Sequence, residues 1–131
     1  MEVGQRLPLG VGATGQALYA TTSDLKRRAA AKANAAWMAE YNYSPTMAEE
    51  LAEDFKDRGY ALNPSIPVQG MSAVALPIQL TTGQTLAAVG IGAINERMSM
   101  ERIETVLLPL LKSEVTGLAD KFDLLEAQGI L

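Results

Sequence analysis

The sequence predicts an α+β domain in which helices pack around an antiparallel sheet. Two observations support this fold class: residues 13–58 show helical periodicity, and residues 73–94 alternate bulky and small apolar side chains around a turn. The chain has 131 residues and 48% hydrophobic content, which is enough for one domain with its own core. No internal repeat or linker interrupts it, so we expect residues 1–131 to form a single domain.

The first helix is expected over residues 13–21, where helix-forming residues follow a glycine-rich turn and no proline intervenes. Ser23 or Asp24 can cap the second helix. The predicted apolar stripe of the second helix consists of Leu25, Ala29, Ala33, Ala36 and Trp37. Its cationic residues are expected on a solvated face, and they are Lys26, Arg27, Arg28 and Lys32.

Thr46 and Glu49 have the spacing of a capping box, which predicts that the third helix begins there. This helix is expected to bury Met47, Leu51 and Phe55. Its other face is predicted to be solvated and carries Glu49, Glu50, Glu53, Asp54 and Asp57. Because these carboxylates spread along an outer face rather than converge, no metal site is expected from them. Gly59 is placed to end the helix in a left-handed conformation.

An antiparallel hairpin is expected next, with one strand over residues 73–80, a turn at residues 81–84 and the partner strand over residues 85–94. Pro77 cannot donate a ladder hydrogen bond, so we expect a bulge or an unpaired edge at its position. A long helix follows over about residues 99–125, with a kink near Pro109. Its predicted apolar stripe is Ile103, Val106, Leu107, Leu110, Leu111, Leu118 and Phe122.

Charge and composition exclude several function classes. The net charge is −4 and no block of Lys and Arg is dense enough to track a phosphate backbone, so the chain is not expected to bind DNA by itself. It has no Cys and no His, which removes disulfides, thiolate nucleophiles and the commonest general base and metal ligand. We expect no cofactor and no metal. No apolar run reaches the length of a membrane span, and a cytoplasmic location is expected.

Two features of the residues point to one pocket. The turn at residues 10–15 runs into a helix, where unpaired amides and the helix dipole favour an anion such as a small carboxylate. Those glycines have a simpler explanation in the tight turn itself. The second feature is a strip of small residues on one sheet face, formed by Ala73, Ala75, Ala88, Gly90 and Gly92. Either a helix packs into the hollow that this strip leaves, or a ligand does.

Residues 7–20 (LPLGVGATGQALYA) contain a Leu-Pro pair, a small-residue turn and a helix start. Residues 58–77 (RGYALNPSIPVQGMSAVALP) run from a helix-ending Arg-Gly-Tyr through a polar loop into a strand of small residues and a Pro. In this order and spacing the two segments resemble the effector-binding domain of the IclR family of bacterial transcriptional regulators. The resemblance continues through residues 83–92 and the last helix, so it covers nearly the whole chain.

The resemblance implies a GAF-like fold. In that family a winged helix-turn-helix, and the opening helix and strands of the effector domain, come earlier in the chain. We therefore interpret residues 1–131 as an incomplete effector-binding domain whose N-terminal part is missing.

The resemblance also implies an effector site between the sheet and the turn before the first helix. The matching positions are Leu7, Ala13, Thr14, Asn63, Met71, Ala73, Gly90 and Gly92. The amides of Ala13 and Thr14 would hold a carboxylate, and Leu7 and Met71 would supply apolar wall. Gln16 stands where the family often has a Lys, and Gly10 where it often has a His, which weakens the argument for an anion.

Members of the family that bind small oxo-acids have an acidic residue, a Cys and two hydroxyls at four of these positions. This chain has Asn63, Ala73, Gly90 and Gly92 there. The pocket is therefore expected to be wider and less polar. We expect an effector bulkier than a two- or three-carbon acid, such as an aromatic carboxylate, with Asn63 as the remaining side-chain hydrogen-bonding group.

The leading functional hypothesis is an effector-binding and oligomerisation domain of an IclR-type transcriptional regulator. It would form a homodimer or homotetramer and reach DNA only through a winged helix-turn-helix outside this chain. One alternative is a protein–protein assembly module without a ligand, which would use the Ala-rich second helix and the last helix. The other is a small enzyme, but no nucleophile is paired with a base at a suggestive spacing, so no catalytic residue is expected.

Overall fold

The computed structural model describes residues 2–64 and 69–131, so residues 65–68 of the predicted polar loop lie outside the described residues. Its helices are α1 (Gly12–Ala20), α2 (Asp24–Ala33), α3 (Ala35–Ala39), α4 (Pro45–Arg58), the single turn α5 (Met100–Arg102) and α6 (Leu108–Ala127). Its strands are β1 (Ala61–Pro64), β2 (Met71–Gln79) and β3 (Thr85–Ile94). The predicted α+β fold with an antiparallel sheet is confirmed.

The sheet has the order β1-β2-β3, and both pairs of neighbours are antiparallel. The predicted hairpin is confirmed as β2 and β3, whereas the short β1 was not predicted, because four residues are too few for a clear alternation. Pro77 pairs with Ala88 of β3, but β1 reaches only as far as Ala75. The sheet therefore has an unpaired edge beside Pro77, as its missing N–H requires.

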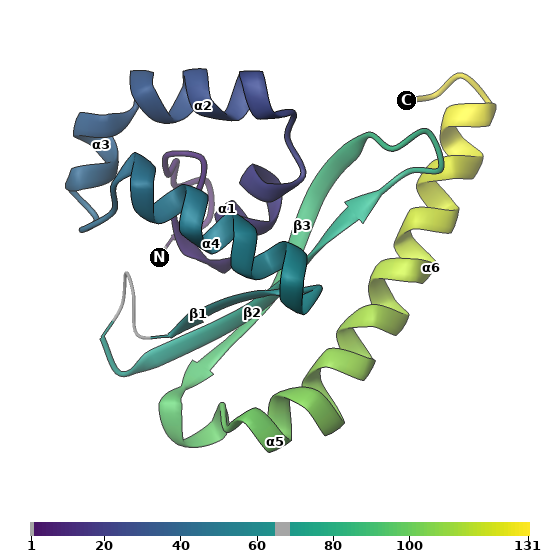
Figure 1. Ribbon diagram of the computed structural model, residues 1–131. Coiled ribbons are helices and arrows are strands. Elements are labelled where there is room, and N and C mark those ends of the chain that lie inside the picture. The colour runs from purple at the N-terminus through teal and green to yellow at the C-terminus, as the bar shows by residue number, and fades with distance from the viewer. Residues whose placement is uncertain (1, 65–68) are drawn as a thin grey trace.

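The two faces of the sheet are covered by different helices (Figure 1). α6 packs on the face with bulky side chains, in a cluster that includes Val74, Leu76, Ile103 and Leu111. α1 packs on the opposite face, where small residues allow close approach. That contact is made by Ala13, Ala17, Ala61 and Ala75, all of which are buried. α2, α3 and α4 lie outside α1 and share a further apolar cluster with it (Figure 1).

The predicted apolar stripe of α2 is wrong. Leu25 is 83% exposed, and the buried residues of this helix are Arg27 and Ala31. The prediction that Arg27 is solvated is therefore wrong too. Its guanidinium forms two hydrogen bonds with the carboxylate of Glu49 on α4, so α2 packs through a charged pair that hydrophobic periodicity does not register.

The start of α4 also differs from the prediction. Ser44 rather than Thr46 caps the helix, because its hydroxyl accepts a hydrogen bond of 3.1 Å from the amide of Met47 and Pro45 fits the first helical position. Glu49 lies in the interior turns of α4 and pairs with Arg27, so it does not belong to a solvated face. Gly59 ends the helix with a φ of 88°, as predicted.

The C-terminal helix is irregular just before Pro109. A π turn at Ile103–Leu107 joins α5 to α6, because Pro109 has no N–H to continue a regular ladder. The wider turn shifts the buried face. Val106 and Leu110 are therefore 48% and 53% exposed, contrary to the predicted stripe, while Leu107, Leu108 and Leu111 are buried. None of the helices in the described part of the chain has the length and apolar character to cross a bilayer.

Candidate functional site

The predicted effector-site residues gather where the N-terminus of α1 meets the sheet. In the sheet register, Asn63 of β1 lies opposite Ala73 of β2, and Ala73 lies opposite Gly92 of β3. Two residues further along, Met71 lies opposite Ile94. Because side chains alternate between faces along a strand, these residues share the face on which α1 packs.

α1 covers one part of the small-residue strip. A Cβ atom built on Gly90 would lie 3.1 Å from Cγ2 of Thr14 and 3.1 Å from the backbone oxygen of Val74. Ala75, next to Gly90 in the register, is buried under Ala13 and Ala17. Here the small residues allow a helix to pack closely on the sheet, which is the first of the two alternatives expected for this strip.

The other part of the strip is open. A Cβ atom built on Gly92 would meet only atoms of the neighbouring strand, Ser72 O at 3.7 Å and Ala73 Cβ at 3.8 Å. Gly92 and Thr14 are exposed, and Met71 and Ile94 are 41% and 50% exposed. We name this surface the open shelf, and its residues are Thr14, Met71, Ala73, Gly92 and Ile94.

A buried hydrogen-bond chain borders the open shelf. The hydroxyl of Tyr43 donates to Oδ1 of Asn63 at 2.8 Å and accepts from the amide of Gly12 at 3.3 Å. Burial raises the pKa of Tyr43, so its hydroxyl stays protonated and can donate. Tyr43 thus connects the first residue of α1 to β1.

Sequence reasoning missed Tyr43. It lies in the connection between α3 and α4, 31 residues from Gly12 and 20 residues from Asn63. No local pattern marks a residue whose partners are so far away in the chain. Only the folding of that connection over α1 brings its hydroxyl to both groups.

The turn before α1 supplies backbone donors. Gly10 and Gly12 have φ angles of 102° and 79°, which glycine adopts without strain. Val11 precedes the helix and its side chain makes no capping bond. Tyr43 occupies the amide of Gly12, while helix geometry leaves the next two amides, of Ala13 and Thr14, without a partner inside α1.

Two further residues were discussed from the sequence. Leu7 is half-buried in the segment before α1, and its place in the effector site stays a prediction. Gln16 is 2% exposed, and its Nε2 donates to the backbone oxygen of Leu51 at 2.8 Å. Gln16 therefore joins α1 to α4 and does not face an anion on the sheet.

No metal-binding cluster is present in residues 2–64 and 69–131, where no three acidic side chains come together as ligands. The open shelf is an apolar surface. It lies beside the backbone amides of Ala13 and Thr14 and the uncharged hydrogen-bond chain of Tyr43 and Asn63. Such an arrangement suits a small, largely apolar ligand better than a metal or a polyanion.

The family described as "Bacterial transcriptional regulator IclR C-terminal" matches residues 1–116. The chain belongs to the IclR family. No curated protein matches its sequence at a significant level. Among solved structures, the C-terminal domain of the Escherichia coli transcriptional regulator KdgR is similar with a TM-score of 0.79 and 18% identity, covering 92% of this chain and 74% of that one.

Two further solved structures of regulators are similar to this IclR-family chain. The Agobacterium tumefaciens repressor BlcR has a TM-score of 0.78 and 22% identity, covering 94% of this chain and 51% of that one. The third structure is the inducer-binding domain of a double mutant of the Acinetobacter transcription factor PobR, in complex with 3-hydroxybenzoic acid. It has a TM-score of 0.69 and 21% identity, covering 90% of this chain and 69% of that one. The chain therefore spans about half the length of BlcR, and these likenesses establish the fold.

Proposed function

We propose that this IclR-family chain is an effector-binding domain that senses an organic acid, of the aromatic class, on the open shelf. The single observation that carries the proposal is that Gly92, which has no side chain, leaves a gap on the sheet face beside the N-terminus of α1. Protein atoms over Ala73, Gly90 and Gly92 would instead favour the assembly alternative. Thr14 lies over Gly90, but no side chain of the described residues outside the sheet lies within 4 Å of a Cβ atom built on Gly92, and this open position supports the ligand.

The amides of Ala13 and Thr14 suit the carboxylate of such an acid. Both lie in the first turn of α1, which holds no acidic side chain that would compete for them. Asn63 is buried, and Tyr43 already occupies its carbonyl oxygen. The acid would then lie with its carboxylate at the helix end and its body over Ala73 and Gly92.

The low polarity of the open shelf supports an aromatic body. Ala73 and Gly92 offer no side-chain hydrogen bond, so a small oxo-acid would leave its carbonyl oxygen unpaired there. Met71 and Ile94 extend the apolar surface beyond them. The likeness in fold to the PobR domain in complex with 3-hydroxybenzoic acid agrees with this class, although only 21% of residues are identical.

Thermal denaturation with a panel of carboxylates tests the proposal. A ligand at 100 times its dissociation constant adds about 2.7 kcal/mol to the stability of the folded state, which raises the melting temperature measurably. We expect a saturable rise with 3-hydroxybenzoate or benzoate. Gly92→Leu should remove the part of the rise that comes from binding at the open shelf, whereas Gly117→Leu places the same side chain in open space on α6 and should retain the whole rise.

Three results would count against this proposal. Tighter binding of pyruvate or glyoxylate than of benzoate, measured by calorimetry, would reject the aromatic class. No saturable rise with any carboxylate would favour the assembly module without a ligand. A rise that Gly92→Leu leaves intact would place the ligand elsewhere on the molecule.

In the whole protein, we propose that effector binding changes the arrangement of subunits and thereby DNA binding by a winged helix-turn-helix outside this chain. Such a regulator acts in the cytoplasm. The matched family and solved neighbours are regulators rather than enzymes, which agrees with a sensory role for residues 1–131.

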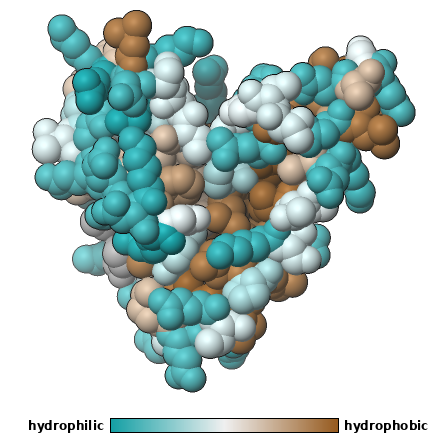
Figure 2. Space-filling view, turned by 45° about the vertical axis from the view of Figure 1, so that its right-hand side comes forward, coloured by the Kyte–Doolittle hydropathy of each residue, from teal (hydrophilic) through white to brown (hydrophobic). Residues whose placement is uncertain are grey.

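A homo-oligomer is part of this proposal, with β3 as the contact. β3 is one of the two edge strands of the sheet in the described residues. It contains no charged residue and no Pro, the features that usually prevent edge strands from pairing with another chain. Figure 2 shows apolar residues gathered in the hollow between the N-terminal helices and α6. Pairing of two β3 strands would continue the sheet across a dimer.

The hydrogen-bond pattern of the sheet provides a test. The amide of Asn95 donates to Gly70 at 2.9 Å, and because bonded pairs alternate in an antiparallel ladder, the amide of Gly92 faces the open edge. Gly92→Pro removes that amide and should lower the mass measured by light scattering. Gly92→Ala keeps the amide and should leave the mass unchanged. A monomeric wild-type chain would contradict the proposed contact.

A further inference from the structure

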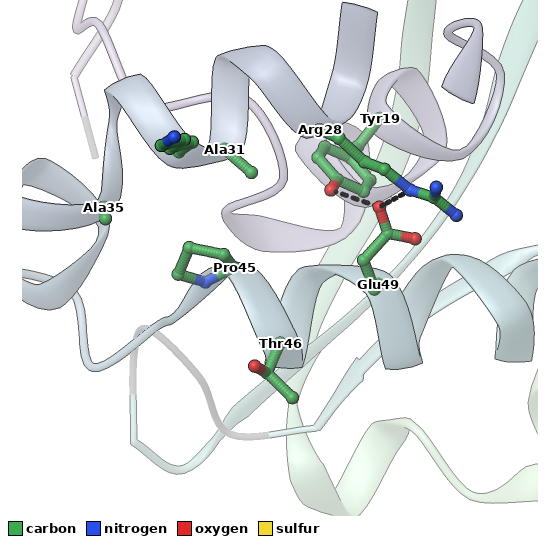
Figure 3. Close-up of a pocket in the computed structure, with 8 residues that line it drawn as sticks. Tyr19, Arg28, Ala31, Ala35, Pro45, Thr46 and Glu49 are labelled. Carbon is green, nitrogen blue, oxygen red and sulfur yellow. Dashed lines mark hydrogen bonds and ion pairs between the residues drawn. The ribbon is translucent and has the colours of Figure 1, made fainter. Parts of the chain in front are cut away.

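A second concave site lies between α2–α3 and α4, away from the open shelf. It is a groove of about 350 Å³, within the range of small-molecule sites. Figure 3 shows Ala31 and Ala35 on one side, Pro45 on the other, and Tyr19, Arg28 and Glu49 at one end. Lys32 and Thr46 complete the lining. No residue of the open shelf belongs to it.

The carboxylate of Glu49 is already neutralised by Arg27, which is only 3% exposed. Nε of Arg27 lies 3.2 Å from Oε1 and one terminal nitrogen lies 3.1 Å from Oε2, so both carboxylate oxygens are occupied. Tyr19 donates a further hydrogen bond of 2.9 Å to Oε1. Burial and this bond to Glu49 raise the pKa of Tyr19 to about 12, so the hydroxyl remains a donor.

Glu49 neutralises the remaining cations of the groove only in part. Nε of Arg28 forms a long ion pair of 3.7 Å with Oε1 of Glu49, which is already bonded to Arg27 and Tyr19, and the Arg28 side chain is 68% exposed. Within residues 2–64 and 69–131, Lys32 forms no ion pair. The groove and the ion pairs beside it contain three cations, on Arg27, Arg28 and Lys32, and two carboxylates, on Asp24 and Glu49. One net positive charge therefore remains.

We propose that this groove is a second small-molecule site, for a monocarboxylate whose charged group is held by Arg28 and Lys32 and whose apolar body lies against Ala31, Ala35 and Pro45. One net positive charge matches one carboxylate, in a chain whose overall charge is −4. A multiply charged anion such as phosphate would also be repelled by Glu49, so it is the less suitable ligand.

The position of the groove gives binding there a structural consequence. A ligand between Ala31 and Pro45 would contact α2 and α4 together, the same helices that the Arg27–Glu49 pair joins. α1 packs against both helices and begins at the open shelf. Occupation of the groove would therefore stabilise the packing of α1, which forms one side of that surface. The groove is nonetheless a separate site, and its test does not depend on the proposed function.

Nuclear magnetic resonance of the ¹⁵N-labelled full chain, titrated with benzoate, resolves the two sites. We expect saturable shifts of the amides of Ala31, Ala35 and Thr46, distinct from any shifts of Thr14 and Gly92. The site is overturned if shifts occur only at Thr14 and Gly92, which would leave the proposed function intact. It is also overturned if inorganic phosphate produces equal or tighter saturation at the groove.

Charge-removing variants complete the test. Arg28→Gln combined with Lys32→Gln should weaken binding at the groove about tenfold or more, since a hydrogen bond between charged groups contributes about 1.5–3 kcal/mol. Lys26→Gln combined with Lys112→Gln removes the same charge from exposed positions outside the groove and should leave the affinity unchanged. Equal weakening in both pairs would show only general charge attraction and would reject the site. Circular dichroism checks that all variants fold.

Discussion

The hydroxyl of Tyr43 donates a hydrogen bond of 2.8 Å to Oδ1 of Asn63, and both residues are buried. The same hydroxyl accepts from the amide of Gly12 at the start of α1. A single side chain from the α3–α4 connection therefore holds the end of α1 against β1. The surface proposed to bind an effector lies beside this contact, so its geometry depends on a residue that never has to touch the ligand.

Removal of this hydroxyl should destabilise the domain. Tyr43→Phe leaves the buried Oδ1 of Asn63 and the amide of Gly12 without their partner, which we expect to lower the free energy of unfolding by about 1–3 kcal/mol. Urea denaturation measures the loss. Tyr41→Phe is the matched control, because Tyr41 is only half-buried and should cost less. Equal losses in the two variants would show that the hydrogen bonds contribute nothing specific.

Stability at acid pH should depend on Glu49. Its hydrogen bonds with Arg27 hold the pKa of Glu49 below its ordinary value of 4.5. The stability contributed by this carboxylate is therefore complete above pH 4.5 and is lost as the pH falls through the lower pKa of the folded state.

Glu49→Gln isolates that contribution. We expect a loss of about 1–3 kcal/mol near pH 7, which shrinks as the pH approaches 3 because the wild-type carboxylate becomes protonated. Urea denaturation across this pH range measures the difference. Glu53→Gln is the control, since Glu53 is 64% exposed and forms a weak surface pair with Lys56 at 3.5 Å. A loss at Glu49 that is the same at both pH values would contradict the assignment.

Gln16 should tolerate an apolar replacement but not a charge. Its Nε2 donates to Leu51, but its Oε1 is buried without a partner among the described residues. Gln16→Met removes one hydrogen bond and one unsatisfied oxygen together, so we expect a change within about 1 kcal/mol. Gln16→Glu buries a carboxylate beside a backbone oxygen and should cost about 2 kcal/mol or more. Thermal denaturation compares them, and the reverse order would contradict this account.

The two glycines of β3 should respond in opposite directions to the same substitution. Gly90→Ala places a Cβ 3.1 Å from the oxygen of Val74 and from Cγ2 of Thr14, and should destabilise the fold by about 1–3 kcal/mol. Gly92→Ala meets only ordinary contacts and should be neutral or stabilise by up to about 1 kcal/mol. Urea denaturation measures both. Combining Gly90→Ala with Thr14→Ser, which lacks the methyl group, should restore part of the loss.

Patterns that depend on neighbouring residues could be predicted from the sequence. The alternation of residues 73–94 predicted β2 and β3, because side chains change face at every residue of a strand. Gly59 ends α4 in the left-handed conformation that was expected of it. The small residues of the sheet face could also be named in advance, and so could the family to which the chain belongs.

Contacts between distant residues were decided only by the tertiary structure. Arg27 and Glu49, 22 residues apart, look like solvated charges on their own helices, and they pair only because α2 and α4 pack together. The π turn before Pro109 rotated the buried face of the last helix away from a regular stripe.

The candidate site shows the same division. The sequence determined which residues of the sheet are small, because composition along a strand is local. Whether that strip is covered or open depends on where the N-terminus of α1 lies above it. Thr14 lies over Gly90, whereas a side chain at Gly92 would meet only atoms of the neighbouring strand. That outcome depends on the packing of a helix against strands more than 50 residues away, which no local pattern encodes.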